Sequence, residues 1–316
     1  MLRVSIIIPC YNSEKIIGCA IQSALSQDYE NKEVIVVDDG SKDNSAKVAK
    51  SFDDVGVLEN ENNIGANISR NRGIRRSSGK YLKFLDADDY LQEGAISKQV
   101  EEMERLRGKR KIVFGDVEVE SREGYEIEKG RRIGGEESQE EFVLSVGFGT
   151  PHPLHKKELI ERVGGFREGI PWWQETDLHM RLAISGVKFC YREGPVATVR
   201  VHDRQDRITG SSWFQEQPHV HIRLVKDWLR LMDEEGRDNE NVRKLLSRDL
   251  WSSGRRALRC DLDEVAEEYF RFAKSLHADC IPDDSILYSS FVQWLGPRLT
   301  ESVAAIRRRI ARSIQR

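Results

Sequence analysis

The chain has 316 residues, a third of them charged, and a formal net charge of −3. This near balance gives no case for a nucleic-acid partner, and no run approaches the roughly eighteen apolar residues of a membrane-spanning helix. The five cysteines are scattered without a Cys-x-x-Cys pair, which disfavours a disulfide framework or a zinc site and is typical of a reducing compartment. The amino terminus shows no signal peptide, so we expect a cytoplasmic protein with one α/β domain and an appendage.

Two short apolar runs near the amino terminus end abruptly at polar residues. The first, Val4–Ile8, stops at Pro9, and the second, Glu33–Val37, stops at Asp38. Both runs are rich in β-branched residues, which is typical of buried parallel strands. We therefore predict two parallel strands whose functional loops meet at one edge of a sheet.

Helical patterns lie between and after these strands. Ser13 is placed to cap a helix before the second strand, and Asp43 or Asn44 is placed to cap a helix after it. A further helix is expected to begin near Ala66 or Asn67. This alternation of strands and helices predicts an α/β fold with a doubly wound parallel sheet.

A third apolar run, Lys80–Leu85, ends in three acids within four residues. Because side chains alternate faces along an extended chain, Asp86 and Asp88 can point the same way. Two converging carboxylates at a strand end suit a hard divalent cation, although an isolated Asp-x-Asp is also typical of a solvated turn. Asp89 is expected to cap the next helix, which would begin near Glu93.

Four motifs, taken together and in this order, resemble the family 2 glycosyltransferases of the GT-A fold. They are Ser5–Asn12, Val37–Asp43, Asn63–Gly73 and Phe84–Asp89. A looser block from about Thr150 to His202 fits the same family, and no counterpart follows about Gly210. Any one motif is a weak signal, whereas four in the family's order and spacing are specific.

The resemblance implies a GT-A domain over residues 1–212, with a doubly wound, mostly parallel sheet flanked by helices. Within it, residues 1–110 form the nucleotide-binding half and residues 111–212 the acceptor-binding half. From Gln215 onward apolar residues recur at helical spacing, so residues 213–316 are predicted to be a helical C-terminal region.

The resemblance implies that the motifs nearest the amino terminus bind the nucleotide. A carboxylate at Asp38 or Asp39, with Asp39 preferred, would accept a hydrogen bond from the N3–H of uracil, which cytosine lacks; alternatively, both acids cap the following turn. Pro9 and Tyr11 are expected to line the base pocket, where the ring of Tyr11 would stack on the nucleotide base. The alternative is that Tyr11 is an ordinary half-buried tyrosine of the loop. The resemblance also places Arg70 at the nucleotide. The alternative is that Arg70 is an exposed arginine on a helix.

A divalent cation, Mn²⁺ or Mg²⁺, is implied on the donor diphosphate. Asp88 is its expected ligand, while Asp86 would contact the ribose or the water shell of the metal. The resemblance implies that His202 is a third metal ligand. The alternative is a structural role, which is the more common one for a single histidine. The metal would act as a Lewis acid on the departing nucleoside diphosphate.

Inverting transfer needs a general base that takes the proton of the acceptor hydroxyl. Aligned on the family's helix pattern, the base position falls on Glu175, where the family more often has Asp. Asp177 is the second candidate, its alternative role being favourable electrostatics at a helix start. Trp172 and Trp173 are expected on the acceptor side, one packing inward and the other lining the cleft.

The end of the chain combines an apolar stripe with clustered arginines. Leu299, Val303, Ile306, Ile310 and Ile314 recur at helical steps, and five arginines lie among the remaining positions. Such a basic amphipathic helix fits peripheral contact with an anionic membrane, at the inner face of the cell membrane. The alternative is that its apolar stripe packs on the protein or on a second copy.

Together these features predict a metal-dependent, inverting glycosyltransferase that moves a sugar from a UDP-sugar to a glycan or lipid-linked acceptor, in cell-envelope polysaccharide or glycolipid synthesis. One alternative is a catalytically inactive module that binds nucleotide or glycan. Another is a sugar nucleotidyltransferase, which would carry a glycine-rich loop where this chain has Pro9–Asn12.

Overall fold

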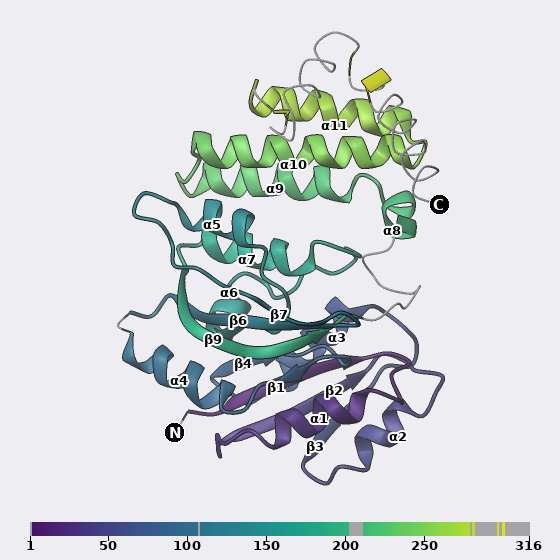
Figure 1. The fold of residues 1–316 in the computed structure, drawn as a ribbon, viewed down its shortest axis with the longest axis vertical. Helices are drawn as coiled ribbons and strands as arrows, with labels where there is room; N and C mark the ends of the chain where they lie inside the picture. The colour runs from purple at the N-terminus through teal and green to yellow at the C-terminus, as the bar shows by residue number, and fades with distance from the viewer. Residues whose placement is uncertain are drawn as a thin grey trace. The chain divides into compact units, whose positions relative to one another are not determined.

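The computed structural model describes residues 2–106, 108–201, 211–278, 280–281, 296 and 299–300 (Figure 1). The chain divides into two compact units, residues 1–205 and 206–316. This division lies close to the boundary predicted between residues 212 and 213. Each unit is described by itself below.

The first unit is built on one mixed sheet. Its strands are β1 (Val4–Cys10), β2 (Lys32–Asp38), β3 (Val55–Glu59), β4 (Tyr81–Phe84), β5 (Tyr90–Leu91), β6 (Lys111–Ser121), β7 (Gly124–Glu128), β8 (Pro153–Lys156) and β9 (Lys188–Arg200). Among the described residues they form a nine-stranded sheet of order β3-β2-β1-β4-β8-β6-β9-β5, with β7 paired to β6. The predicted nucleotide and acceptor halves therefore share a single sheet.

Strand direction changes between the two parts of this sheet. β2, β1 and β4 pair in parallel, as predicted, and β3, which was not predicted from the sequence, pairs in parallel with β2. β8 then pairs antiparallel to both β4 and β6, whereas β6 and β9 run parallel. The doubly wound parallel arrangement thus describes the amino-terminal part, and the remainder of the sheet is mixed.

Helices cover the sheet (Figure 1). They are α1 (Ile17–Leu25), α2 (Ser45–Lys50), α3 (Ala66–Arg76), α4 (Ala95–Arg105), α5 (Gln139–Val146), α6 (Lys157–Arg162) and α7 (Gln174–Ile184). The predicted alternation of strands and helices is confirmed in this unit, and the helices α1 and α3 pack on β1.

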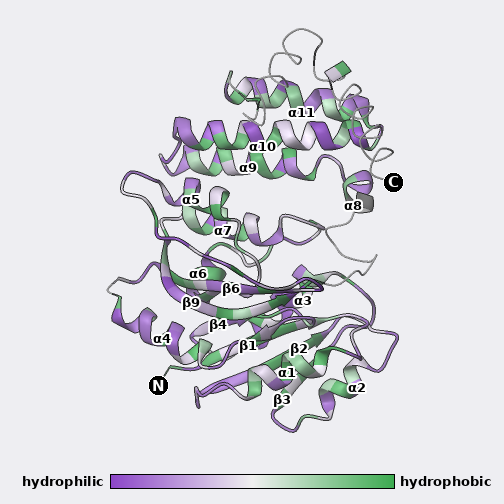
Figure 2. Ribbon diagram, in the orientation of Figure 1, coloured by the Kyte–Doolittle hydropathy of each residue, from purple (hydrophilic) through white to green (hydrophobic). Residues whose placement is uncertain are grey.

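The central strand β1 is buried along its whole length, and β1 and β2 are largely hydrophobic (Figure 2). Ile6 faces one side of the sheet and shares a core cluster with Ile21 of α1. Ile7 faces the other side, where a Cβ on Gly73 of α3 would overlap its side chain. Because Gly73 lets α3 approach the sheet this closely, Arg70, one turn earlier, is carried to the edge of the sheet.

Of the two predicted helix caps, the one at Ser13 differs from the structure, whereas Asp43 does accept a backbone N–H at the start of α2. α1 begins at Ile17, and the Ser13 hydroxyl donates to the carbonyl of Tyr11 instead of capping the helix. The residue before α2 is Asn44, whose side chain makes no cap, while Asp43 accepts from the N–H of Ser45 at 2.9 Å. Competition from nearby loop groups explains both outcomes, because short polar side chains bind whichever local partner is closest.

The second unit is helical in its described part, as predicted. It contains α8 (Ser211–Glu216), α9 (Val220–Glu234), α10 (Glu240–Arg259) and α11 (Asp263–Leu276). Trp251 of α10 packs against Phe270 of α11, with ring centroids 4.5 Å apart. The basic amphipathic helix predicted for residues 299–314 lies outside the described residues, apart from Leu299 and Thr300.

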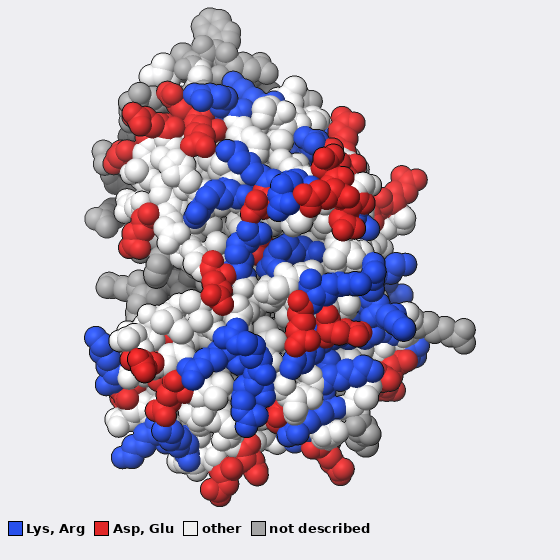
Figure 3. All heavy atoms as spheres, turned by 180° about the vertical axis from the view of Figure 1, so that it is seen from behind, with Lys and Arg blue, Asp and Glu red and all other residues white. Residues whose placement is uncertain are grey.

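In the part of the chain that the structure describes, none of the helices combines the length and the apolar character needed to cross a membrane. Figure 3 shows Lys and Arg side chains interspersed with Asp and Glu over the visible face. This mixture agrees with the formal net charge of −3.

Candidate active site

The carboxyl ends of three neighbouring strands meet at one edge of the sheet. β1 lies between β2 and β4, with Cys10 opposite Asp38 and Ile7 opposite Phe84. The acids that follow β4, beginning at Asp86, therefore leave the sheet beside the loops that follow β1 and β2. The sequence predicted this convergence, and in open α/β sheets it is the usual place for a ligand.

A cavity of about 790 Å³ lies against the loops after β1 and β2. Its lining residues are Tyr11, Asp38, Gly40–Asn44, Ala46, Lys47, Lys50 and Glu59–Asn63. Tyr11 is 40% exposed, so its ring is available for stacking. Pro9, expected to line the base pocket, is buried within β1 and is not among these lining residues.

The two adjacent acids after β2 have different surroundings. Asp38 accepts from the N–H of Ser41 through Oδ2 at 3.0 Å, and its buried Oδ1 has no hydrogen-bond partner among the described residues. Asp39 accepts from the side chain of Asn60 and from the N–H groups of Ile64 and Gly65 at 2.7 to 3.0 Å. Asp38 therefore keeps an unused acceptor, whereas Asp39 is occupied by the loop 60–65.

Gly40, which follows these two acids, lies close to the backbone of the loop 60–65. Gly40 has a φ of +70°, and a Cβ there would lie 2.5 Å from the backbone carbon of Asn62. Its lack of a side chain thus permits a close approach of the chain to itself.

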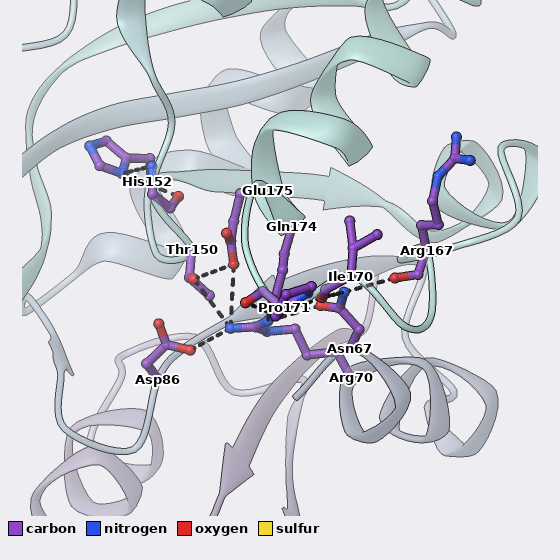
Figure 4. A network of polar contacts seen from close by, with 11 residues as sticks. Asn67, Arg70, Asp86, Thr150, His152, Arg167, Ile170, Pro171, Gln174 and Glu175 are labelled. Carbon is purple, nitrogen blue, oxygen red and sulfur yellow. Dashed lines mark hydrogen bonds and ion pairs between the residues drawn. The ribbon is translucent and has the colours of Figure 1, made fainter. Parts of the chain in front are cut away.

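Arg70 is the centre of a polar network that joins the two parts of the sheet (Figure 4). One terminal nitrogen, Nη2, lies 2.8 Å from Asp86 and 3.4 Å from Glu175. The other, Nη1, donates to Gln174 at 2.8 Å. Thr150 accepts from Nη2 at 3.4 Å and donates to Glu175 at 3.0 Å. The expected metal-side acid and the expected base therefore share one guanidinium.

Arg70 is buried, which excludes the alternative of an exposed helical arginine. Burial would lower the pKa of Arg70, but the neighbouring Asp86 and Glu175 raise it, so the side chain is a fixed cation. The guanidinium also lies 5.2 Å from the ring centroid of Phe166. Arg70 does not line the 790 Å³ cavity; it lies between Asp86 and Glu175.

Helix α3 also holds the loop that leads to α7. Asn67 donates to the carbonyl of Arg167 at 2.8 Å, and Asn71 exchanges two hydrogen bonds with the backbone of Phe166 at 2.8 and 2.9 Å. These amides use side-chain groups to satisfy a loop backbone. One face of α3 thus orients Arg70 and also fixes the backbone of residues 166–167, in the loop that leads to α7.

The acidic turn after β4 differs in one respect from expectation. Asp86 and Asp88 are half-buried, but Asp89 is buried and accepts from the N–H of Arg200 at 3.0 Å. Burial, together with the charges of Asp86 and Asp88, raises the pKa of Asp89 to about 8. Asp89 does not cap the next helix, which begins at Ala95; it joins this turn to the end of β9 instead.

Asp86 and Asp88 present carboxylate oxygens, which are the ligands that Mg²⁺ and Mn²⁺ accept together with water and phosphate oxygens. No group of three or more potential metal ligands occurs within the described residues, so the cation would depend on donor oxygens for part of its shell. His202, the predicted third ligand, lies outside the described residues.

The two candidate bases occupy different environments at the start of α7. Glu175 is half-buried and has its Oε1 held by Thr150. Asp177 is fully buried and pairs with Arg181 at 2.8 Å and with Arg167 at 3.3 Å. A base must contact the acceptor, so the geometry favours Glu175, and Asp177 acts as an internal counter-ion for the two arginines.

Trp172 and Trp173 are both half-buried, with ring centroids 5.9 Å apart. Trp173 has a φ of +64°, a left-handed conformation that is strained for a bulky residue, and it directly precedes α7. The expected division, with one indole inward and one in the cleft, is not evident from burial alone.

Sequence reasoning gave no role to Thr150 and Gln174, although both contact Arg70. The family resemblance implies a Glu/Gln-Asp pair just before a helix, and Gln174 and Glu175 stand at its two positions. The signal for Gln174 was therefore available in the sequence. Thr150 opens the looser block of resemblance, but its hydroxyl is identified only by its contacts in three dimensions.

Comparisons with known proteins identify the family to which the chain belongs. The sequence profile described as Glycosyl transferase family 2 matches residues 5–164. An uncharacterized glycosyltransferase of Rickettsia typhi is 32% identical over 224 residues, covering 67% of this chain and 68% of the relative. The chain therefore belongs to glycosyl transferase family 2 and is a glycosyltransferase enzyme.

Two relatives with named activities each match about half of this chain. The UDP-Glc:alpha-D-GlcNAc-diphosphoundecaprenol beta-1,3-glucosyltransferase of Escherichia coli is 37% identical over 163 residues, 51% of this chain and 57% of the relative. The GalNAc(5)-diNAcBac-PP-undecaprenol beta-1,3-glucosyltransferase of Campylobacter jejuni is 31% identical over 169 residues, 51% of this chain and 54% of the relative. This chain thus aligns with about half the length of each.

Among solved structures, residues 1–349 of S. aureus TarS in complex with UDP-GlcNAc superpose with a TM-score of 0.58. The sequence identity is 14%, and the match covers 87% of this chain and 91% of TarS 1–349. At this identity the likeness establishes the GT-A fold, which confirms the predicted fold class.

Proposed function

We propose that this glycosyltransferase transfers a sugar from a UDP-sugar to a diphospholipid-linked acceptor, with inversion and with a divalent cation. The observation that carries the proposal is the shared guanidinium of Arg70, which brackets Asp86 on the donor side and Glu175 on the acceptor side. The names of the glucosyltransferases of E. coli and C. jejuni support a lipid-linked acceptor. The proposed reaction would belong to the synthesis of envelope polysaccharide or glycolipid.

The base and ribose of the donor would bind in the 790 Å³ cavity. The unpartnered Oδ1 of Asp38 can accept the N3–H of uracil, and the exposed ring of Tyr11 can stack on the base. Asp39, preferred from the sequence, would contribute by holding the loop 60–65 against the cavity. A cytosine base lacks the N3 proton, so the site would discriminate against it.

Asp88 and Asp86 would hold Mn²⁺ or Mg²⁺. When bound, the cation would neutralise charge on the departing diphosphate as a Lewis acid. The chain itself fixes the position of this turn, because Asp89 binds the backbone of Arg200 and Arg70 binds Asp86.

Glu175 would take the proton of the acceptor hydroxyl. As this O–H bond breaks, the acceptor oxygen bonds to the anomeric carbon, and the bond from that carbon to the diphosphate oxygen breaks on the opposite face. The electron pair leaves with the nucleoside diphosphate, so one displacement inverts the anomeric configuration. Thr150 and Arg70 hold Oε1 of Glu175, which leaves Oε2 for the proton.

The test uses UDP-glucose and UDP-GlcNAc as donors, and GlcNAc-diphosphoundecaprenol as acceptor, with Mn²⁺ or Mg²⁺ present or chelated. Asp88→Ala and Glu175→Gln should each lower turnover by at least about a hundredfold. Glu175→Gln should still bind UDP in calorimetry, and the exposed Asp53→Ala is the matched control. Full activity of Glu175→Gln would remove the base assignment.

The same assay separates the alternative functions. Tight UDP binding without turnover of any donor would favour an inactive nucleotide-binding module. Formation of a UDP-sugar from a sugar phosphate and UTP would favour a nucleotidyltransferase. Peripheral membrane contact by residues 299–316 is proposed with the acceptor chemistry, because a diphospholipid is presented at a membrane surface.

A further inference from the structure

Lys83 is a fully buried lysine in β4, three residues before Asp86. Its Nζ donates to the carbonyl of Pro151 at 2.6 Å and to Oε1 of Gln99 at 2.7 Å. Buried lysines are rare unless paired with an acid, yet both partners here are neutral oxygens. An apolar side chain at this position would avoid the cost of burying an amine, so the lysine needs an explanation.

Gln99 of α4 completes the arrangement around Lys83. It is also fully buried, and its Nε2 donates to the carbonyls of His152 at 2.9 Å and Val113 at 3.3 Å. Two consecutive carbonyls, those of Pro151 and His152, are therefore satisfied by side chains of β4 and α4. Buried carbonyls outside regular structure require such partners.

These two carbonyls follow Thr150 directly. Thr150 in turn donates to Oε1 of Glu175 at 3.0 Å, the oxygen that also faces Arg70. A continuous path of hydrogen bonds and one peptide link thus runs from Lys83 to the carboxylate expected to act as the base. The strand that carries Lys83, β4, ends at Phe84, and Asp86 follows two residues later. The same segment of chain therefore leads to both the donor-side acid and the acceptor-side loop.

We propose that Lys83 is a positioning residue that fixes the acceptor-side loop 149–152 through Pro151 and so sets the orientation of Glu175 by way of Thr150. This inference rests on the proposed function, in which Glu175 is the base. Lys83 touches neither donor nor acceptor, and its contribution is geometric. An amine donates both hydrogen bonds whether or not it carries a third proton, so the contact does not depend on its charge.

The test is a double-mutant cycle of Lys83→Met and Thr150→Val on turnover of UDP-glucose, with Glu175→Gln as the reference for loss of the base. Each single variant should lower kcat about ten- to a hundredfold, because small misplacements of a catalytic group have effects of this order. Calorimetric binding of UDP should be unchanged. In the Thr150→Val background, Lys83→Met should lower kcat by no more than about twofold further, because the path is already broken.

Lys156 supplies a matched control. It is a buried lysine of the adjacent strand β8, and its Nζ donates to the carbonyl of Lys109 at 2.7 Å, away from Thr150. Lys156→Met should lower the unfolding midpoint without changing kcat. If Lys156→Met lowered kcat as much as Lys83→Met does, the loss of kcat would come from general destabilisation of the fold and not from the position of Glu175. That result would overturn the inference.

The other outcomes are also decisive. Multiplicative effects of Lys83→Met and Thr150→Val, with Glu175→Gln inactive, would overturn the inference and leave the proposed function standing. Wild-type turnover in Glu175→Gln would remove the proposed base and the inference with it. Non-additive effects on kcat, combined with unchanged UDP binding, would establish the positioning role.

Discussion

The burial of Lys83 predicts a specific pH dependence of stability. Desolvation lowers the pKa of Lys83 in the folded protein from 10.5 to about 7. Below pH 7 the amine is protonated in both the folded and the unfolded chain, so it adds no pH dependence there. Between pH 7 and 10.5 the unfolded chain binds a proton that the folded protein has lost, so the free energy of unfolding rises with pH in this window.

The magnitude follows from the size of the shift. Each unit of pKa difference corresponds to about 1.4 kcal/mol, so raising the pH from 7 to 9.5 should add about 3 kcal/mol to the free energy of unfolding from this group alone. His152 and His155 are neighbouring buried histidines, but burial lowers their pKa values to about 4 and 3, outside the window. Comparison with Lys83→Met removes the contributions of all other groups.

The assay is urea unfolding of wild type and Lys83→Met at pH 7 and pH 9.5, with the free energy extrapolated to water. The difference between the two proteins should change by about 3 kcal/mol in favour of wild type as the pH rises. Lys129→Met is the control, because that side chain is exposed and is not desolvated on folding. Parallel pH profiles for wild type and Lys83→Met would refute the reasoning, since they would mean that water reaches the buried amine.

Four further predictions follow from the site. Asp38→Asn should weaken UDP binding about tenfold in calorimetry without loss of stability. Asp39→Asn should lower the thermal midpoint instead, because the loop 60–65 loses a charged acceptor. The reverse pattern would restore Asp39 as the residue that contacts the nucleotide base. Arg70→Met should lower kcat at least about a hundredfold while UDP binding is retained. Arg70→Lys should not restore kcat, because a lysine cannot hold Asp86 and Gln174 together. Loss of UDP binding in Arg70→Met would show that Arg70 contacts the nucleotide. Trp173→Gly should relieve about 1 kcal/mol of backbone strain while raising the acceptor KM, and a drop in stability with an unchanged KM would contradict an acceptor role. Flotation with anionic liposomes should favour the full chain over one truncated before residue 299, and equal binding by both would exclude membrane contact through that segment.

The sequence was sufficient for the parts of the fold that depend on local pattern. Strands such as Val4–Cys10 are apolar, β-branched and bounded by polar residues, so their identity and their shared edge could be predicted. The mixed direction of β8 could not, because strand pairing depends on contacts distant in sequence. The capping role given to Asp89 failed for the same reason, since its partner is the N–H of Arg200.

The candidate site shows the same limit. The acids Asp38, Asp86 and Glu175 could be identified by motif, but their surroundings could not. That Asp38 rather than Asp39 keeps a free oxygen depends on the path of the loop 60–65, which occupies Asp39. Likewise, the role of Arg70 depends on residues about a hundred positions away, which only folding brings together.

The close contact between α3 and β1 also limits how the sequence can vary. A methyl group added at Gly73 would overlap the side chain of Ile7, and the neighbouring backbone of α3 holds Arg70 and Asn71 in place. Natural variation at these two positions should therefore be correlated: where a relative has alanine at the position of Gly73, a smaller residue such as valine or alanine is expected at that of Ile7. Such paired changes would preserve the distance between helix and strand, and with it the place of the arginine.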